Sequence, residues 1–153
     1  MSGAPVFSPS LRGRALRLLA AREHSRAELQ RKLAPHETEP GSLARALDEL
    51  AAKGFISEQR VAESVARRRG ARLGAARVIQ ELRAKGVEAQ VLAETAAQLK
   101  DTELARARDV WVRKFGEPAA DPAARLRQMR FLAARGFAPE VIRRVVKGAE
   151  DDA

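Results

Sequence analysis

Hydrophobic positions recur along residues 74–99 with the spacing of two consecutive amphipathic helices, and polar positions lie between them. The first apolar positions follow an i, i+3, i+4, i+7 spacing, which places them on one face of an α-helix: Ala75, Val78, Ile79 and Leu82. Gly86 predicts the end of this helix, because glycine adopts the left-handed C-terminal cap conformation without a Cβ penalty. A second stripe, from Val91 to Leu99, predicts a neighbouring helix joined to the first by a short turn.

The same pattern recurs elsewhere in the chain. At an offset of 50 residues, Leu132 aligns with Leu82 and Gly136 with Gly86. A looser copy upstream places Leu29 on Leu82 and is followed by a proline-containing loop. Repeats of this length are typical of helical arrays, so the sequence predicts three tandem units.

The limits of these units follow from helix start and stop signals. Ser25 with Glu28 predicts a capping box, Ser42 and Ser57 predict helix N-caps, and Thr102 is taken to open the third unit. We therefore expect an N-terminal arm, three helical repeats of which the second is basic, and an acidic tail: residues 1–10, 11–56, 57–100, 101–149 and 150–153. About nine helices result.

Composition supports an all-α class. Alanine, leucine and arginine dominate, and the chain has no Tyr and one Trp, so strands have few residues to form from. The absence of Cys excludes disulfides and thiol catalysis and suits a reducing compartment. No apolar run approaches the roughly 18 residues of a membrane span, and the N-terminus lacks a signal-peptide pattern, so we expect a cytoplasmic protein without membrane contact.

Positive charge is concentrated in the middle of the chain. The formal net charge is +9, and residues 60–85 carry eight Lys and Arg against two Glu. A patch of this kind favours binding to a polyanion or to an acidic protein surface. The candidate binding residues are Arg60, Arg67, Arg68, Arg69, Arg72, Arg77, Arg83 and Lys85.

Catalytic and cofactor chemistry has little support. Only His24 and His36 could contribute imidazole, no Cys can join them, and the phosphate-loop, GxSxG and HExxH motifs are absent. Adjacent acids such as Asp48 and Glu49 point about 100° apart on a helix and do not converge. We therefore expect a binding protein with no cofactor and no metal.

Three separated blocks, in the same order, resemble the RecX family of regulatory proteins, which modulate the recombinase RecA. The blocks are Gly54–Ile56 with Arg60–Ala62, Arg77–Val87, and Arg130–Phe137 with Ile142, Val145 and Val146. The chain departs from the family pattern at Val61, where an aromatic residue is usual, and in the loop 34–41. The acidic pair usual before Val61 is reduced to Ser57 and Glu58. The departures at Val61 and at this pair affect local packing more than function, whereas the loop affects the geometry of the first repeat.

The resemblance implies an elongated, curved array of three three-helix repeats that lies in the groove of a RecA filament on single-stranded DNA. Family members restrain ATP hydrolysis, strand exchange and RecA-stimulated repressor cleavage. The basic residues given above would then contact the filament or its DNA. We also expect a monomer, because no sustained heptad seam is visible.

Two other interpretations stay open at this point. A helix, a short turn and a basic flank could form a DNA-binding helix-turn-helix, although residues 88–99 offer no arginine to read base edges. Weak direct DNA binding is compatible with either view. The chain could also be a generic helical scaffold for some other acidic protein.

Overall fold

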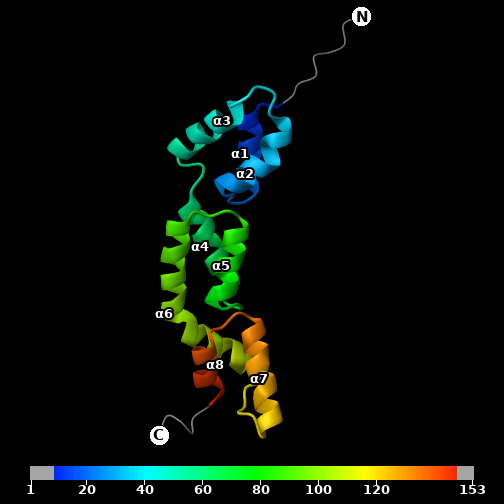
Figure 1. Cartoon of the computed structure of the whole chain (residues 1–153), viewed down its shortest axis with the longest axis vertical. Coiled ribbons are helices and arrows are strands. Elements are labelled where there is room, and N and C mark those ends of the chain that lie inside the picture. Colours follow the sequence, from blue (N-terminus) through cyan, green and yellow to red (C-terminus); the bar gives the residue numbers. More distant parts are fainter. Residues whose placement is uncertain (1–8, 148–153) are drawn as a thin grey trace, which may run out of the picture. The chain divides into compact units, whose positions relative to one another are not determined.

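The computed structural model describes residues 9–147, which contain eight α-helices, one short 3-10 helix at Ala34–His36 and no strand within that range (Figure 1). The helices are α1 (Leu11–Ala21), α2 (Arg26–Leu33), α3 (Ser42–Ala52), α4 (Glu58–Arg69), α5 (Ala75–Ala84), α6 (Ala89–Lys114), α7 (Pro122–Ala134) and α8 (Pro139–Val146). The all-α class is confirmed. Within the described part, no helix is both long and apolar enough to cross a bilayer.

The chain divides into two compact units. Unit 1 comprises residues up to 61 together with 85–87, and unit 2 comprises residues 62–84 and those from 88 onward. The expected acidic tail and the first eight residues of the expected arm lie outside the described residues.

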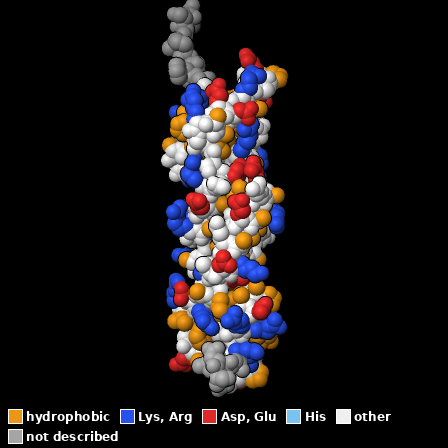
Figure 2. Space-filling model, turned by 90° about the vertical axis from the view of Figure 1, so that its left-hand side faces the viewer, with side chains coloured by type: hydrophobic (Ala, Val, Ile, Leu, Met, Phe, Trp, Pro, Cys, Tyr) orange, Lys and Arg blue, Asp and Glu red, His pale blue; other side chains and the backbone are white. Residues whose placement is uncertain are grey.

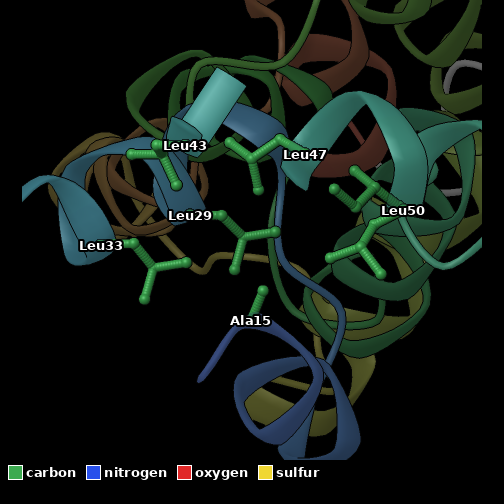
Figure 3. Packing of buried hydrophobic residues seen from close by; sticks show 7 residues of the cluster. Ala15, Leu29, Leu33, Leu43, Leu47 and Leu50 are labelled. Atoms are coloured by element: carbon green, nitrogen blue, oxygen red, sulfur yellow. The ribbon is translucent and has the colours of Figure 1, made fainter. Parts of the chain in front are cut away.

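Unit 1 has a leucine core formed by α1, α2 and α3. Leu29 of α2 lies among Ala15 of α1 and the leucines of α3, and all of these side chains point toward one another (Figure 3). Leu29, Leu43, Leu47 and Leu50 are fully buried. Burial of a leucine side chain contributes roughly 1.5–3 kcal/mol, so these positions account for much of the stability of the unit.

A side-chain cap fixes where α2 begins but not where α3 begins. Ser25 accepts a hydrogen bond from the Glu28 N–H while Glu28 accepts from the Ser25 N–H, which confirms the predicted capping box. The predicted cap at Ser42 is wrong. Gly41 is the N-cap of α3, and the Ser42 hydroxyl instead donates to the carbonyl oxygen of Glu39 at 2.7 Å. A serine that can donate backwards into a turn does not have to cap the following helix.

The short segment 85–87 packs against α2 within unit 1. Gly86 has φ +75°, as the predicted left-handed cap requires, and a Cβ at this position would lie 2.5 Å from the Ala27 Cβ. The equivalent glycine of the third repeat, Gly136, has φ +88°. Leu82 and Leu132, four residues before each glycine, are both fully buried, in keeping with the internal repeat.

Unit 2 is organised along α6. Helix α5 packs against α6, and α7 and α8 pack together against α6 around a core that includes Ala107, Leu132 and Phe137. Gly74, before α5, touches the α7–α8 turn so closely that a Cβ would lie 2.2 Å from the Gly136 carbonyl oxygen. Its N–H donates to the carbonyl oxygen of Arg135 at 2.8 Å.

The expected helix boundary near residue 100 does not exist. Helix α6 runs without interruption for 26 residues, so it supplies both the last helix of the second repeat and the first helix of the third. Thr102, predicted to open a new helix, has its hydroxyl directed at the carbonyl oxygen of Leu99 at 3.3 Å. No Gly or Pro separates the two predicted segments, and the hydrogen-bond ladder therefore continues. This merger explains eight α-helices where nine were expected.

Candidate functional site

The eight predicted binding cations do not form one set in the structure. Arg60 and Lys85 belong to unit 1, and the other six belong to unit 2. On the face shown in Figure 2, each unit carries Lys and Arg side chains interspersed with Asp and Glu. Whether a given cation is available for a partner therefore depends on its own neighbours.

Arg60 is occupied by contacts within unit 1. Its Nε lies 2.9 Å from Glu23 Oε1, and a terminal nitrogen donates to the carbonyl oxygen of Gly54 at 2.6 Å. The side chain is still 44% exposed. Arg60 thus connects α4 with the turns before α2 and after α3, and a structural role accounts for its position.

Lys85 is also engaged inside unit 1. Its side chain is only 19% exposed, and its Nζ lies 3.6 Å from Glu28 Oε2, which Arg22 contacts at 2.8 Å. The Ser25 hydroxyl donates to the Lys85 carbonyl oxygen. Burial opposes ionisation of Glu28, but the hydrogen bonds from Arg22 and the Ser25 N–H and the charge of Lys85 outweigh it and lower the pKa of Glu28 to about 2.

Two of the predicted cations in unit 2 also have partners. Arg69 pairs with Glu81 at 3.4 Å, which links α4 to α5. Arg77 donates to the carbonyl oxygen of Ala134 at 2.7 Å, at the C-terminal end of α7. A cation suits this position, because the last carbonyl groups of a helix are unpaired and carry partial negative charge.

The remaining four predicted cations are exposed, and no carboxylate among residues 9–147 pairs with them: Arg67, Arg68, Arg72 and Arg83. They lie at the end of α4, in the turn that follows it and at the end of α5. These are the members of the predicted set best placed to meet an anionic partner.

The turn between α4 and α5 is held in place by α6. Arg106 donates to the carbonyl oxygens of Gly70 and Leu73 at 2.9 and 2.7 Å and to that of Leu99 at 2.8 Å. Burial lowers the pKa of Arg106, opposed by the nearby charge of Glu103. Glu103 itself is buried and accepts from the Ala75 N–H at 2.7 Å, so it caps α5 from a different helix.

This fixed turn brings Arg72 to a basic hollow of about 330 Å³ in unit 2. We refer to it as the basic pocket, and define it by Arg72 of the turn, Arg113 and Lys114 of α6, and Phe131 and Arg135 of the α7 region. Val110 and Ala71 complete its wall, so no acidic side chain lines it. None of its four cations has an ion-pair partner among the described residues.

Phe131 organises two of the pocket cations. The Lys114 Nζ lies 5.3 Å from the centre of the Phe131 ring, and the guanidinium carbon of Arg135 lies 4.9 Å from it. Phe115 meets the same ring edge-on, with 5.5 Å between centroids and an interplanar angle of 87°. Cation–π contacts of this geometry stabilise positive charge beside the ring and hold both cations at the pocket wall.

Three of the four cations of the basic pocket were not predicted as binding residues. In the sequence, Arg113 and Lys114 have the pattern of ordinary cations at a helix C-terminus. Arg135 aligns with Lys85 in the internal repeat. Their convergence depends on the packing of α7 beside the end of α6, which no local pattern specifies. The one available signal is the sequence Arg113–Lys114–Phe115, in which two cations precede an aromatic residue.

Comparison with known proteins relates the chain to one family. Models of the first, second and third three-helix domains of RecX match residues 12–50, 57–95 and 101–146. The regulatory protein RecX of Leptothrix cholodnii is 51% identical over 143 residues, covering 94% of this chain and 91% of that protein. RecX of Ralstonia nicotianae is 48% identical over 92% of this chain and 89% of its own.

Solved structures show the same fold. The crystal structure of RecX from Lactobacillus salivarius has a TM-score of 0.78 at 14% identity and covers 92% of this chain and 94% of that chain. A second RecX crystal structure gives a TM-score of 0.73 at 20% identity, with coverage of 90% and 71%. Three tandem three-helix domains are therefore the architecture of this chain.

Proposed function

Because the chain belongs to the RecX family of regulatory proteins, we propose that it is a negative modulator of the RecA recombinase. In this proposal it binds in the groove of the RecA filament on single-stranded DNA and restrains ATP hydrolysis, strand exchange and repressor cleavage. Family membership is the observation that carries the proposal, since RecA regulation is what the family is named for.

The charge distribution in unit 2 supports contact with such a filament. Arg67, Arg68, Arg72 and Arg83 are exposed and have no carboxylate partner among residues 9–147, so binding an anionic partner breaks no ion pair of the described fold. Helical repeats also offer extended surfaces suited to large partners. We expect the protein to act by binding, without a cofactor, as a monomer in the cytoplasm, where RecA filaments form.

The first test is inhibition of RecA ATP hydrolysis on single-stranded DNA by a charge-reversal variant of unit 2. Arg67→Glu, Arg68→Glu and Arg83→Glu change three exposed side chains that make no ion pair with the described residues. Arg69 is left unchanged, because a glutamate there would face Glu81. We expect inhibition to be lost while the circular dichroism spectrum and the melting temperature stay close to wild type.

The matched control reverses three exposed arginines of unit 1: Arg12, Arg17 and Arg45. This control loses the same charge and should keep most of the inhibition. Equal loss of inhibition in both variants would show that the overall charge of the protein, and not this surface, causes the effect. Full inhibition by the unit 2 variant would show that this surface does not contact the filament.

A second measurement separates filament binding from direct DNA binding. Fluorescence anisotropy compares naked single-stranded DNA, duplex DNA and RecA-coated single-stranded DNA as targets of the labelled protein. Preference for coated DNA is expected. Equal affinity for naked duplex DNA would instead favour a DNA-binding helix-turn-helix protein. Affinity should fall as salt rises, because phosphate contacts release counterions and exposed charges are screened over about 10 Å at 0.1 M salt.

A further inference from the structure

The basic pocket contains more unpaired positive charge than the fold of unit 2 requires. Its four cations come from three separate segments, and no acidic side chain lines the hollow. Like charges brought together in this way repel one another, which is destabilising unless an anion or solvent compensates. The arrangement is therefore better explained by a ligand than by internal packing.

The geometry points to a phosphodiester group of single-stranded nucleic acid as the ligand of the basic pocket. Three of the cations are arginines, whose planar donor forks match phosphate oxygens, and Lys114 adds a point charge. The hollow, at about 330 Å³, lies at the small end of the roughly 300–1,000 Å³ range of ligand pockets. It suits one phosphate with its ester-linked neighbours.

A phosphate fits this arrangement better than the carboxylate of an acidic peptide. Donors converge from the α4–α5 turn, from the end of α6 and from the end of α7. A tetrahedral phosphate presents oxygens in several directions and can accept from all three sides at once. A planar carboxylate accepts mainly within one plane, so it would leave some of these cations without a partner.

The pocket is suited to binding the phosphate backbone of a nucleic acid and not its bases. Exposed aromatic rings bind single strands by stacking on bases, but the Phe131 ring already holds Lys114 and Arg135 and meets Phe115 edge-on. Phe131 therefore positions cations and does not provide a stacking surface. Binding at this site should be independent of base identity, as phosphate contacts are.

The inference rests on the proposed function in one respect: the strand is taken to be single because the filament is formed on single-stranded DNA. The phosphate site itself does not require RecA. It can therefore be tested directly, with a fluorescein-labelled oligo(dT) of about 30 nucleotides and the full chain, without any other protein.

The test variant is R113Q/R135Q, which removes two pocket guanidinium groups. Its matched control is R125Q/R127Q, which removes two exposed arginines of α7 that are not part of the pocket. We expect at least about a tenfold weaker Kd for the pocket variant, as for lost hydrogen bonds between charged groups, and less than about a threefold change for the control. The plot of log Kobs against log salt should be shallower by about 1.4 for the two lost phosphate contacts.

Three further probes identify what the pocket recognises. An abasic oligomer of the same length should bind like oligo(dT), whereas an oligomer with a neutral methylphosphonate backbone should bind no better to wild type than to R113Q/R135Q. If the abasic oligomer did not bind, the proposal that the pocket contacts the phosphate backbone would be overturned. Poly-glutamate that binds wild type more tightly than oligo(dT), and loses that binding in R113Q/R135Q, would show that the pocket takes acidic peptide.

A second variant keeps the proposal testable if R113Q/R135Q does not fold. R113K/R135K retains both charges, so its salt dependence should match wild type while its affinity falls about threefold for want of bidentate contacts. Wild-type affinity in this variant would overturn the role of the guanidinium groups.

RecA assays then separate the two proposals. Wild-type protein that binds oligo(dT) through the pocket but does not inhibit RecA would overturn the proposed function and support the phosphate site. Wild-type inhibition of RecA, together with a pocket variant that binds oligo(dT) as its control does, would overturn the phosphate site alone.

Discussion

Substituting Gly86 by alanine tests how the segment 85–87 is attached to unit 1. Two separate costs arise. The left-handed backbone at φ +75° costs a residue with a Cβ roughly 1–2 kcal/mol. The new Cβ would also lie 2.5 Å from the Ala27 Cβ, and such overlap costs about 1–3 kcal/mol. Alanine recovers about 0.4–1 kcal/mol by restricting the unfolded chain, so we expect a net destabilisation of about 2–4 kcal/mol.

Gly54 provides a matched control for the contact with Ala27. It also has a left-handed backbone, at φ +82°, but nothing lies within 4 Å of a Cβ built there. Gly54→Ala should therefore cost only about 1 kcal/mol, from the backbone term alone. The difference between the two substitutions measures the contact between the segment 85–87 and α2.

Urea unfolding followed by far-UV circular dichroism and by tryptophan fluorescence is the suitable assay. The single tryptophan, Trp111, lies in unit 2, so its fluorescence follows that unit while circular dichroism follows both. The loss should appear in the circular dichroism transition of unit 1. Adding Ala27→Gly to Gly86→Ala should restore part of the stability, as a positive coupling in a double-mutant cycle. Equal destabilisation by Gly86→Ala and Gly54→Ala, without coupling to Ala27, would refute the close contact between Gly86 and Ala27.

Three further substitutions test the core, the α4–α5 turn and the acid dependence of unit 1. Leu82→Ala should destabilise by about 2–5 kcal/mol in thermal melts because Leu82 is fully buried, whereas exposed Gln80→Ala should cost less than about 0.5 kcal/mol. Arg106→Met should cost about 2–4 kcal/mol in urea unfolding, because two turn carbonyls lose their charged donor; a smaller loss than for Gln80→Ala would contradict that role. The pKa of Glu28 is lowered, so its stabilisation is present above its ordinary pKa of 4.5 and is lost as pH falls through about 2. Urea unfolding between these pH values should show a decline of about 1–3 kcal/mol that is absent in Glu28→Gln, and an identical decline in both proteins would exclude Glu28 as its source.

Local features of this fold follow from local sequence. The capping box at Ser25 and Glu28 and the left-handed Gly86 each depend on residues within a few positions of one another, and both are present. The hydrophobic spacing of residues 75–82 likewise predicts α5, because one helical turn brings those residues to the same face.

Features that depend on tertiary packing could not be predicted in this way. Glu103 reads as a solvated helix residue, yet it is buried and caps α5 from 28 positions away. Lys85 is predicted to be an available cation, yet its Nζ approaches the carboxylate of Glu28, which belongs to the preceding repeat. In both cases the packing of the helices determines which residue becomes the partner. The position of charged residues in the sequence does not predict that packing. The convergence of Arg72 with Arg113, Lys114 and Arg135 also depends on helix packing, so it could not be predicted from the sequence.

The continuous helix α6 restricts how the length of this chain can change. At 100° per residue, the 19 steps from Val91 to Val110, the first and last of its buried positions, amount to five full turns and about 100° more. The face that packs against α5 is therefore rotated from the face that packs against α7 and α8. Deleting one residue between them would turn the second face by about 100° and shift it by about 1.5 Å, presenting polar side chains to the core. Inserting seven residues would change the phase by only about 20° but would move the second face by about 10 Å along the axis. The contacts of Gly74 and Arg77 with the end of α7 would then be lost, so we expect this stretch of α6 to tolerate neither change in length.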